Sequence, residues 1–277
     1  MKHLVTADWL IQNLNNPKLV VLDASMRYPL PGLKNELDQG CIDGARYFDF
    51  EQQICDRKSQ YSCMMPAKEQ CQEHMRQLGI NQDSQIVVYD NIGVYSAPRA
   101  WWMIRAMGHE DVFVLNGGLQ AWMLAGGAMA DDYQLPKHKG NFVAKDTSMF
   151  VDAEQVKHAS ESDSADIVDA RSPQRFSGEE ADPRPNVRSG HIPRSKNLHY
   201  KELLQDLFLK DSVELAEIVA KQLPDPQRPV IFSCGSGITA CILALAAAES
   251  GYVALSVYDG SWSEWGNRDD LPVATGV

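Results

Sequence analysis

One cysteine stands where the sequence could place a reactive sulfur. Cys234 follows an apolar run, Val230 to Phe232, that is typical of a buried strand, and it precedes a helical pattern that starts near Ile238. Open α/β sheets bind ligands at the carboxyl ends of their strands, and a helix N-terminus at that edge favours negative charge. Gly235 and Gly237 let backbone N–H groups turn inward around the sulfur. The pattern predicts an anion cradle suited to a thiolate or a persulfide.

The remaining cysteines are expected to be small buried hydrophobic residues, and they stand at Cys41, Cys55, Cys63, Cys71 and Cys241. The chain has no C-x-x-C pair, so neither a zinc site nor any other metal site is expected. Cys241 falls inside an apolar helical pattern and is expected to fill the core. A cysteine phosphatase would need an arginine six positions after its nucleophile, and this chain has Ala240 there. The sequence therefore excludes phosphatase chemistry.

A repeat organises the chain around this cysteine. The segment Val114–Trp122 aligns with Val257–Trp265, 143 positions later. Each half holds three β-branched runs between helical stretches, namely Val20–Leu22, Ile86–Tyr89, Val112–Leu115, Ile167–Val168, Val230–Phe232 and Leu255–Tyr258. Strands that alternate with helices indicate an α/β fold of two tandem domains, each a mainly parallel sheet with helices on both faces.

The two halves differ at the position that matters for chemistry. Asp90 stands where the second half has Cys234, and a carboxylate cannot carry a sulfur atom. We therefore expect a non-catalytic domain at 1–132, a linker at 133–149 and a catalytic domain at 150–277. The stretch from Ser177 to Gly190 is rich in glycine, proline and charge, so it is expected to be a long loop of the second half, and Arg175, just before it, and Arg184 are expected to belong to the same loop segment. Loops of this length are usually functional or disordered.

Composition narrows the class of protein. The 277 residues include 26 Lys and Arg against 37 Asp and Glu, a net charge of −11 that argues against nucleic-acid binding. The longest apolar stretch, Ile238–Val257, is interrupted by Glu249, so a membrane span is not expected. The N-terminus carries no apolar targeting segment, and a cytoplasmic location is expected.

Three features together resemble the two-domain rhodanese family of sulfurtransferases: the duplicated halves, the loop after Cys234 and the stretch Tyr258–Trp265. The resemblance covers nearly the whole chain and extends to Ser96–Trp102 and Gly190–Pro193. It implies a catalytic cysteine at Cys234 and an active-site loop made of Gly235, Ser236, Gly237, Ile238 and Thr239. This loop looks like that of the family's 3-mercaptopyruvate sulfurtransferases, Cys-Gly-Ser-Gly-Val-Thr, because the thiosulfate enzymes carry Arg and Lys after the cysteine.

The resemblance also implies that Arg175 and Arg184 bind the substrate. A guanidinium forms two parallel hydrogen bonds with a carboxylate, which suits mercaptopyruvate. Thiosulfate is a compact dianion that favours basic side chains beside the thiolate, where Gly235 and Ser236 are neutral. Arg188 lies close by in the sequence, so positive charge is expected to gather at one mouth of an acidic protein.

The family's proposed relay of serine, histidine and an acid is only partly matched. Ser236 matches the serine, Cys63 stands at the histidine position, and Glu51 corresponds best to the acid. A thiol is a poor substitute for an imidazole base, so the relay is not expected to operate in this form. Two interpretations of Cys63 remain open, namely drift and a redox or sulfur-accepting thiol.

These features predict an enzyme that moves sulfur from 3-mercaptopyruvate through a Cys234 persulfide and releases pyruvate. Ser236, Thr239 and loop N–H groups are expected to stabilise developing charge. The expected acceptor is cyanide, a small thiol or a thioredoxin-like protein, and no cofactor is implied. Two alternatives remain, a thiosulfate:cyanide sulfurtransferase and a sulfur carrier without turnover.

Overall fold

The chain folds into two compact units, seen in a computed structural model that describes residues 2–27 and 40–276. The first unit comprises Met1–Lys58, Met65–Thr147 and Asp206–Leu209, and the second comprises Ser59–Met64, Ser148–Gln205 and Lys210–Val277. Between residues 131 and 149 the backbone forms neither helix nor strand. No helix in the described ranges is long and apolar enough to cross a bilayer.

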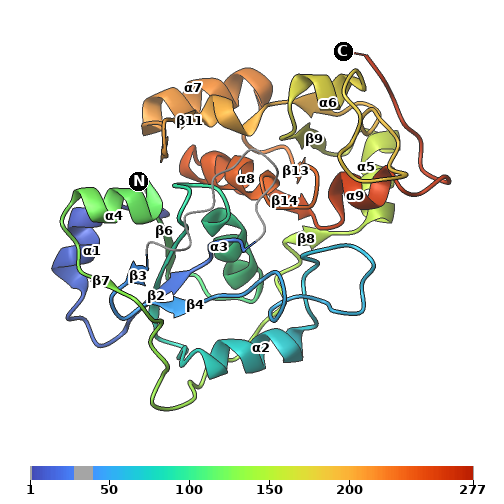
Figure 1. Ribbon diagram of the computed structural model, residues 1–277. Helices are drawn as coiled ribbons and strands as arrows, with labels where there is room; N and C mark the ends of the chain where they lie inside the picture. Colours follow the sequence, from blue (N-terminus) through green and yellow to red (C-terminus); the bar gives the residue numbers. More distant parts are fainter. Residues whose placement is uncertain (1, 28–39, 277) are drawn as a thin grey trace. The chain divides into compact units, whose positions relative to one another are not determined.

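The first unit is built on a five-stranded parallel sheet with the order β1-β6-β5-β2-β4. Figure 1 labels β2, β4 and β6 of this sheet. Its strands are β1 (Leu4–Val5), β2 (Leu19–Asp23), β4 (Arg46–Tyr47), β5 (Gln85–Tyr89) and β6 (Val112–Leu115). The short strands β3 (Cys41–Ile42) and β7 (Met129–Ala130) form a separate antiparallel pair. The helices are α1 (Ala7–Asn13), α2 (Lys68–Gln77), α3 (Ala97–Ala106) and α4 (Gly118–Leu124).

The helices of the first unit cover its sheet. Leu10 of α1 and Trp122 of α4 share one hydrophobic cluster with Val21 and Val87 of the sheet. Helix α3 packs against β5 and β6. Because β5 is buried along nearly its whole length, it is the continuous apolar strand expected of a covered parallel sheet.

The second unit repeats this topology with the order β10-β9-β13-β14-β8, again all parallel. Its strands are β8 (Phe150–Val151), β9 (Asp166–Asp169), β10 (Lys196–Asn197), β13 (Val230–Ser233) and β14 (Leu255–Tyr258). Strands β6 and β14 begin and end 143 positions apart, which is the offset of the sequence repeat. The predicted duplication and the parallel α/β class are confirmed.

The helices of the second unit are α5 (Ala153–Ser162), α6 (Pro173–Ser177), α7 (Ser212–Gln222), α8 (Ala240–Glu249) and α9 (Ser261–Trp265). A 3-10 turn, η2 (Tyr200–Leu203), precedes the short strand β11 (Leu204–Gln205). The short strand β12 (Phe208–Leu209) belongs to the segment assigned to the first unit. Helices α5 and α9 pack on one cluster with Ile167 and Ile231. Helix α8 contacts β13, β14 and α7, and its Ala-rich sequence lets these neighbours bury eight of its ten residues (Figure 1).

Candidate active site at the end of strand β13

Cys234 lies directly after β13, as the sequence predicts, and its side chain is buried. The helix that follows begins at Ala240, and the Ile238 carbonyl already accepts a hydrogen bond from Cys241 N at 3.0 Å, in agreement with a predicted start near Ile238. The backbone of Gly237 has a φ of 74°, in the left-handed region, so the helix cannot extend further toward the strand. Residues 235–239 therefore form a loop between the cysteine and the helix.

The backbone of Cys234 is fixed by the start of α9. The Ser261 hydroxyl accepts a hydrogen bond from the Cys234 N–H at 3.2 Å and donates one to the Tyr258 carbonyl at 2.8 Å. Trp262 N donates to the Cys234 carbonyl at 3.0 Å. Ser261 has a φ of 47°, an unusual value for a residue with a side chain. Both backbone polar groups of the cysteine are thus satisfied, which holds it in one position.

Ser261 escaped the prediction from sequence, although the repeat contains a signal for it. The 143-residue offset pairs Ser261 with Gly118, whose φ is 56°. A side chain at Gly118 would place its Cβ 2.2 Å from the Asp90 carbonyl oxygen. The second half thus has a serine at the position where the first half needs a glycine. A serine in a backbone conformation that favours glycine indicates that its side chain makes a specific contact.

The two predicted substrate-binding arginines come together beside Gly235. A methyl group in place of one Gly235 hydrogen would lie 3.2 Å from Arg184 Nη2 and 3.5 Å from Arg175 Nη2. The side chains of Arg175 and Arg184 are only 15% and 28% exposed. Two guanidinium groups therefore lie beside Gly235, the residue that follows Cys234. Because glycine has no side chain, they can lie close to its backbone.

The location of Arg175 corrects the prediction that it belongs to a long loop. It lies in α6, whose start is defined by Pro173 and by the Ser172 hydroxyl, which accepts a hydrogen bond from Arg175 N at 3.4 Å. Proline is favoured in the first turn of a helix and serine at its N-cap, so the local sequence specifies this short helix. Arg184 does lie in the irregular stretch after Gly178.

Asp182 joins the two arginines, and the sequence reasoning missed it. Its carboxylate accepts a hydrogen bond from Arg175 Nη2 at 2.7 Å and others from Arg184 Nη1 at 3.1 Å and Arg184 N at 3.0 Å. Burial raises the pKa of this carboxyl, but the hydrogen bonds and the charges of both arginines outweigh burial, so the pKa is lowered. The Asp182 carboxylate is therefore ionised at neutral pH.

Arg188 does not belong to this positive cluster, which corrects the expectation of three cations at one mouth. Its guanidinium donates hydrogen bonds to backbone carbonyls at the end of α9 and beyond, namely those of Trp265, Gly266, Arg268 and Leu271. Arg171, also buried, pairs with Asp169 at 2.7 Å and lies over the Trp262 ring at 4.3 Å. Both residues support the α9 end of the unit.

The other members of the predicted loop differ in exposure. Ser236 is half-buried, whereas Ile238 and Thr239 are buried. Cys63 is buried, has a φ of 61° and belongs to the same unit as Cys234. Glu51 belongs to the first unit, where its carboxylate accepts a hydrogen bond from Arg27 N at 2.6 Å.

The remaining cysteines in the first unit are poor nucleophiles. Burial raises the pKa of Cys41 to about 11 and that of Cys71 to about 12, and it also raises the pKa of Cys55. A thiol with so high a pKa stays protonated at neutral pH. In the second unit Cys241 is fully buried in α8 with its sulfur 3.2 Å from the Gly237 carbonyl oxygen, as expected of a core residue.

The corresponding loop of the first unit, after β5, binds a carboxylate through its backbone N–H groups. Asp90 follows β5 and is fully buried, and its carboxylate accepts five backbone hydrogen bonds of 2.8–2.9 Å. The donors are the N–H groups of Ile92, Gly93, Tyr95, Ser96 and Ala97. A loop between strand and helix thus binds an anion in this fold, and here the anion is the protein's own side chain.

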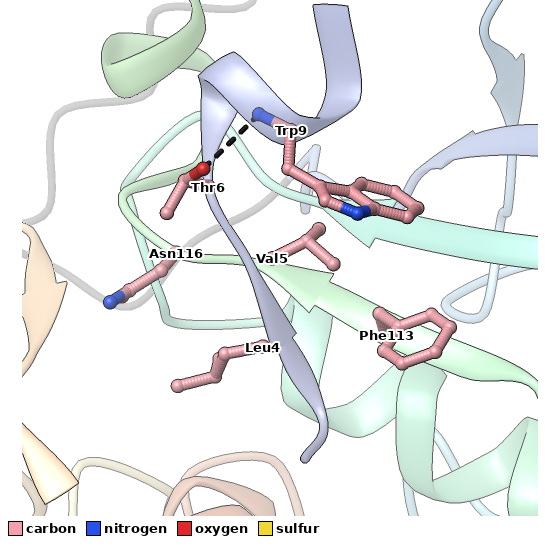
Figure 2. Close-up of a pocket in the computed structure, with 6 residues that line it drawn as sticks. All are labelled: Leu4, Val5, Thr6, Trp9, Phe113 and Asn116. Atoms are coloured by element: carbon pink, nitrogen blue, oxygen red, sulfur yellow. Dashed lines mark hydrogen bonds between the residues drawn. The ribbon is translucent and has the colours of Figure 1, made fainter. Parts of the chain in front are cut away.

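A cavity of about 450 Å³ lies elsewhere in the first unit, along the edge strand β1. Figure 2 shows its lining, which is mainly apolar: Leu4, Val5, Thr6, Trp9, Phe113 and Asn116. The Thr6 hydroxyl accepts a hydrogen bond from Trp9 N at the start of α1. None of these six residues is a predicted catalytic or substrate-binding residue.

A duplicated parallel α/β domain with a cysteine loop in one copy defines a class of protein. The sequence matches the Rhodanese-like domain family over residues 6–125 and 152–268, and the chain belongs to this family. It is 40% identical to 3-mercaptopyruvate sulfurtransferase of Escherichia coli (strain K12), over 97% of this chain and 96% of that protein. It is 37% identical to thiosulfate sulfurtransferase of Cricetulus griseus, over 95% of this chain and 91% of that protein.

Among solved structures, the chain is similar to SseA from Escherichia coli, a 3-mercaptopyruvate sulfotransferase with the rhodanese fold. The TM-score is 0.83 at 36% sequence identity, and the match covers 95% of this chain and 99% of that one. The chain thus has similar sequence identity to a 3-mercaptopyruvate sulfurtransferase and to a thiosulfate sulfurtransferase, 40% and 37%. The choice of donor must be argued from the site itself.

Proposed function

We propose that this rhodanese-family chain is a sulfurtransferase that takes sulfur from 3-mercaptopyruvate onto Cys234 and releases pyruvate. The observation that carries the proposal is the pair of guanidinium groups beside Gly235, 3.2 and 3.5 Å from where a Cβ would stand. A 2-oxo acid carries its carboxylate a few bonds away from its sulfur. Arginines beside the residue that follows the cysteine suit that geometry, because their fork binds a carboxylate through two hydrogen bonds.

In the first half-reaction the Cys234 thiolate attacks the sulfur of the donor. The new S–S bond forms as the C–S bond breaks, and the electron pair of the C–S bond passes to the carbon, which leaves as pyruvate enolate. The thiol proton of the donor balances the protonation of that enolate to pyruvate. Ser236, Thr239 and the loop N–H groups stabilise the persulfide anion, in the way that five N–H groups bind the Asp90 carboxylate in the first unit.

In the second half-reaction an acceptor removes the outer sulfur and regenerates the thiolate. Cyanide becomes thiocyanate, and a small thiol becomes its own persulfide. A thioredoxin-like dithiol is oxidised to a disulfide, and the outer sulfur leaves as hydrosulfide. A reducing compartment such as the cytoplasm suits this chemistry, since it keeps the acceptor thiols and the Cys234 thiol reduced.

Thiosulfate is the second candidate donor, because the chain is 37% identical to a thiosulfate sulfurtransferase. A dianion next to the thiolate would be stabilised by basic side chains in the loop itself. Gly235 and Ser236 supply none, so we expect a lower kcat/KM with thiosulfate than with 3-mercaptopyruvate.

Peptide mass spectrometry after incubation with 3-mercaptopyruvate tests the proposal. We expect an adduct of about 32 Da on the peptide that contains Cys234. The adduct should remain in the matched variant Cys241→Ala, which removes a neighbouring core thiol, and should disappear in Cys234→Ala. No adduct on the wild type, or an adduct that survives in Cys234→Ala, would refute the assignment. Loading of Cys234 without any pyruvate release would instead identify a sulfur carrier.

A further inference from the structure

We infer that Asp182 positions the two arginines and sets the net charge of the donor site, so that the site favours a singly charged carboxylate donor over a dianion. This inference rests on the proposed role of Arg175 and Arg184 in binding the donor. It assigns a positioning and specificity role to a residue that does not itself bind the donor.

Asp182 binds both arginines, because each of its carboxylate oxygens accepts hydrogen bonds from one of them. Oδ2 accepts a hydrogen bond from Arg175 Nη2, and Oδ1 accepts from both Nη1 and N of Arg184. The Asp182 side chain is only 1% exposed. Two long side chains from different segments, α6 and the stretch after Gly178, are thereby locked to one carboxylate. Such preorganisation lowers the entropy lost when a ligand binds.

Arg175 and Arg184 each keep an N–H donor that does not bind Asp182. Arg175 Nε is buried and has no hydrogen-bond acceptor within residues 2–27 and 40–276. Arg184 Nη2 faces Gly235. A buried donor without an acceptor destabilises a protein unless a ligand supplies the acceptor. Asp182 thus binds one edge of each guanidinium. The remaining N–H groups are left for the carboxylate of the sulfur donor.

The charge of the cluster also favours a singly charged donor. Two guanidinium groups and one carboxylate carry a net charge of plus one, which balances one carboxylate of a 2-oxo acid. A dianion would remain half-compensated in a partly buried site, and an uncompensated buried charge is costly. Removing the negative charge of Asp182 should therefore shift the preference toward a dianionic donor.

Asp182→Asn tests this inference, because asparagine keeps the size and removes the charge. We expect KM for 3-mercaptopyruvate to rise about tenfold with a smaller change in kcat, since one charge-assisted hydrogen bond to the arginines is lost. The ratio of kcat/KM for thiosulfate to that for 3-mercaptopyruvate should also rise, by about tenfold. Asp182→Glu restores the charge and should keep this ratio within about twofold of the wild type, even where both rates fall.

Asp163→Asn is the matched control. Asp163 also bridges two arginines of the second unit, Arg194 and Arg228, but its side chain is 57% exposed. The substitution changes the net charge of the protein by the same amount, so an unchanged donor ratio in this variant excludes a general charge effect. Thermal unfolding of each variant establishes that it folds, and Asp182→Glu carries the test of the ratio if Asp182→Asn does not fold.

The inference is overturned if Asp182→Asn keeps the KM and donor ratio of the wild type, or if Asp182→Glu shifts the ratio as far as Asp182→Asn does. In either case the wild type can still load Cys234 from 3-mercaptopyruvate, and the proposed function stands. If the wild type does not load from 3-mercaptopyruvate, the proposed function itself fails.

Discussion

The loops after β5 and β13 occupy the same place in two copies of one topology, and they differ in what fills them. In the first unit, five N–H groups bind the Asp90 carboxylate. In the second, the residue at that place is Cys234, and two arginines stand beside the next residue. In the first copy the loop binds an anion, and the second copy has a cysteine at the corresponding position. Under the proposed function, that cysteine makes the second loop a binding site for sulfur.

In the first unit, a later segment of the chain packs against the loop after β5. A Cβ at Gly93 would lie 2.5 Å from the Leu207 carbonyl oxygen, and one at Gly117 would lie 2.3 Å from the Phe208 ring. The segment Asp206–Leu209 therefore packs directly on the loop after β5 and on the start of α4, within the same unit. Asn116 holds this segment in place, since its side-chain oxygen accepts a hydrogen bond from Leu209 N at 2.9 Å.

The largest expected effect is on catalysis, from Cys234→Ala. Removal of a covalent nucleophile should lower the rate of sulfur transfer at least about 10³-fold. The free energy of unfolding should change by less than about 1 kcal/mol, because one small buried side chain replaces another. Steady-state assays of pyruvate release and urea titrations measure the two quantities. Activity within tenfold of the wild type would show that the sulfur is carried elsewhere.

Asp90→Ala should have the opposite profile. The substitution leaves five backbone N–H groups, four of them in buried hydrogen bonds, without their acceptor. Each unsatisfied buried group costs about 1–3 kcal/mol before relaxation. We expect the free energy of unfolding to fall by at least about 3 kcal/mol, measured by urea denaturation. A loss below about 1 kcal/mol, similar to that of Cys234→Ala, would mean that the two cradles do not differ in this way.

Arg184→Gln should have an intermediate effect confined to the second unit. An arginine that binds the donor carboxylate contributes about 1.5–3 kcal/mol, so kcat/KM for 3-mercaptopyruvate should fall about 10- to 150-fold. Arg194→Gln, which removes an exposed arginine of the same unit, is the control and should leave kcat/KM unchanged. Equal losses in the two variants would place Arg184 outside the donor site.

The smallest expected effect is a pH dependence of stability that comes from Asp182. The pKa of this carboxyl in the folded protein lies below its ordinary value of 3.8. Its contribution to stability is therefore complete above about pH 4 and is lost as the pH falls through the folded pKa. The difference in Tm between the wild type and Asp182→Asn should shrink as the pH is lowered from 6 to 3. A difference that grows on acidification would reverse the sign of the shift.

The sequence predicts the fold well because the fold depends on local patterns that occur twice. Both strands β6 and β14 were predicted with their observed ends, since β-branched runs bounded by turn residues define them. The start of α8 was predicted near Ile238 and lies at Ala240, but hydrophobic periodicity does not reveal the left-handed backbone of Gly237 that precedes it. Element ends depend on backbone conformation more than on apolar pattern.

The candidate site was only partly predictable. Cys234 and the two arginines stand in recognisable strings, whereas Ser261 acts through a contact 27 residues away in the chain. Asp182 lies between two predicted residues, yet an acidic residue in a charged stretch is usually solvated, and only its burial reveals its role. The Ser261 contact follows from packing across 27 residues of chain, which no local pattern of the sequence encodes.

The most direct test of the central claim is a single-turnover measurement without an acceptor. Mixing the protein with one equivalent of 3-mercaptopyruvate should release about one equivalent of pyruvate per chain, with one sulfur retained on Cys234 and none on the other cysteines. Addition of cyanide should then release that sulfur as thiocyanate and restore the original mass. No burst of pyruvate, or a burst that persists unchanged in Cys234→Ala, would contradict sulfur capture by the cradle of the second unit.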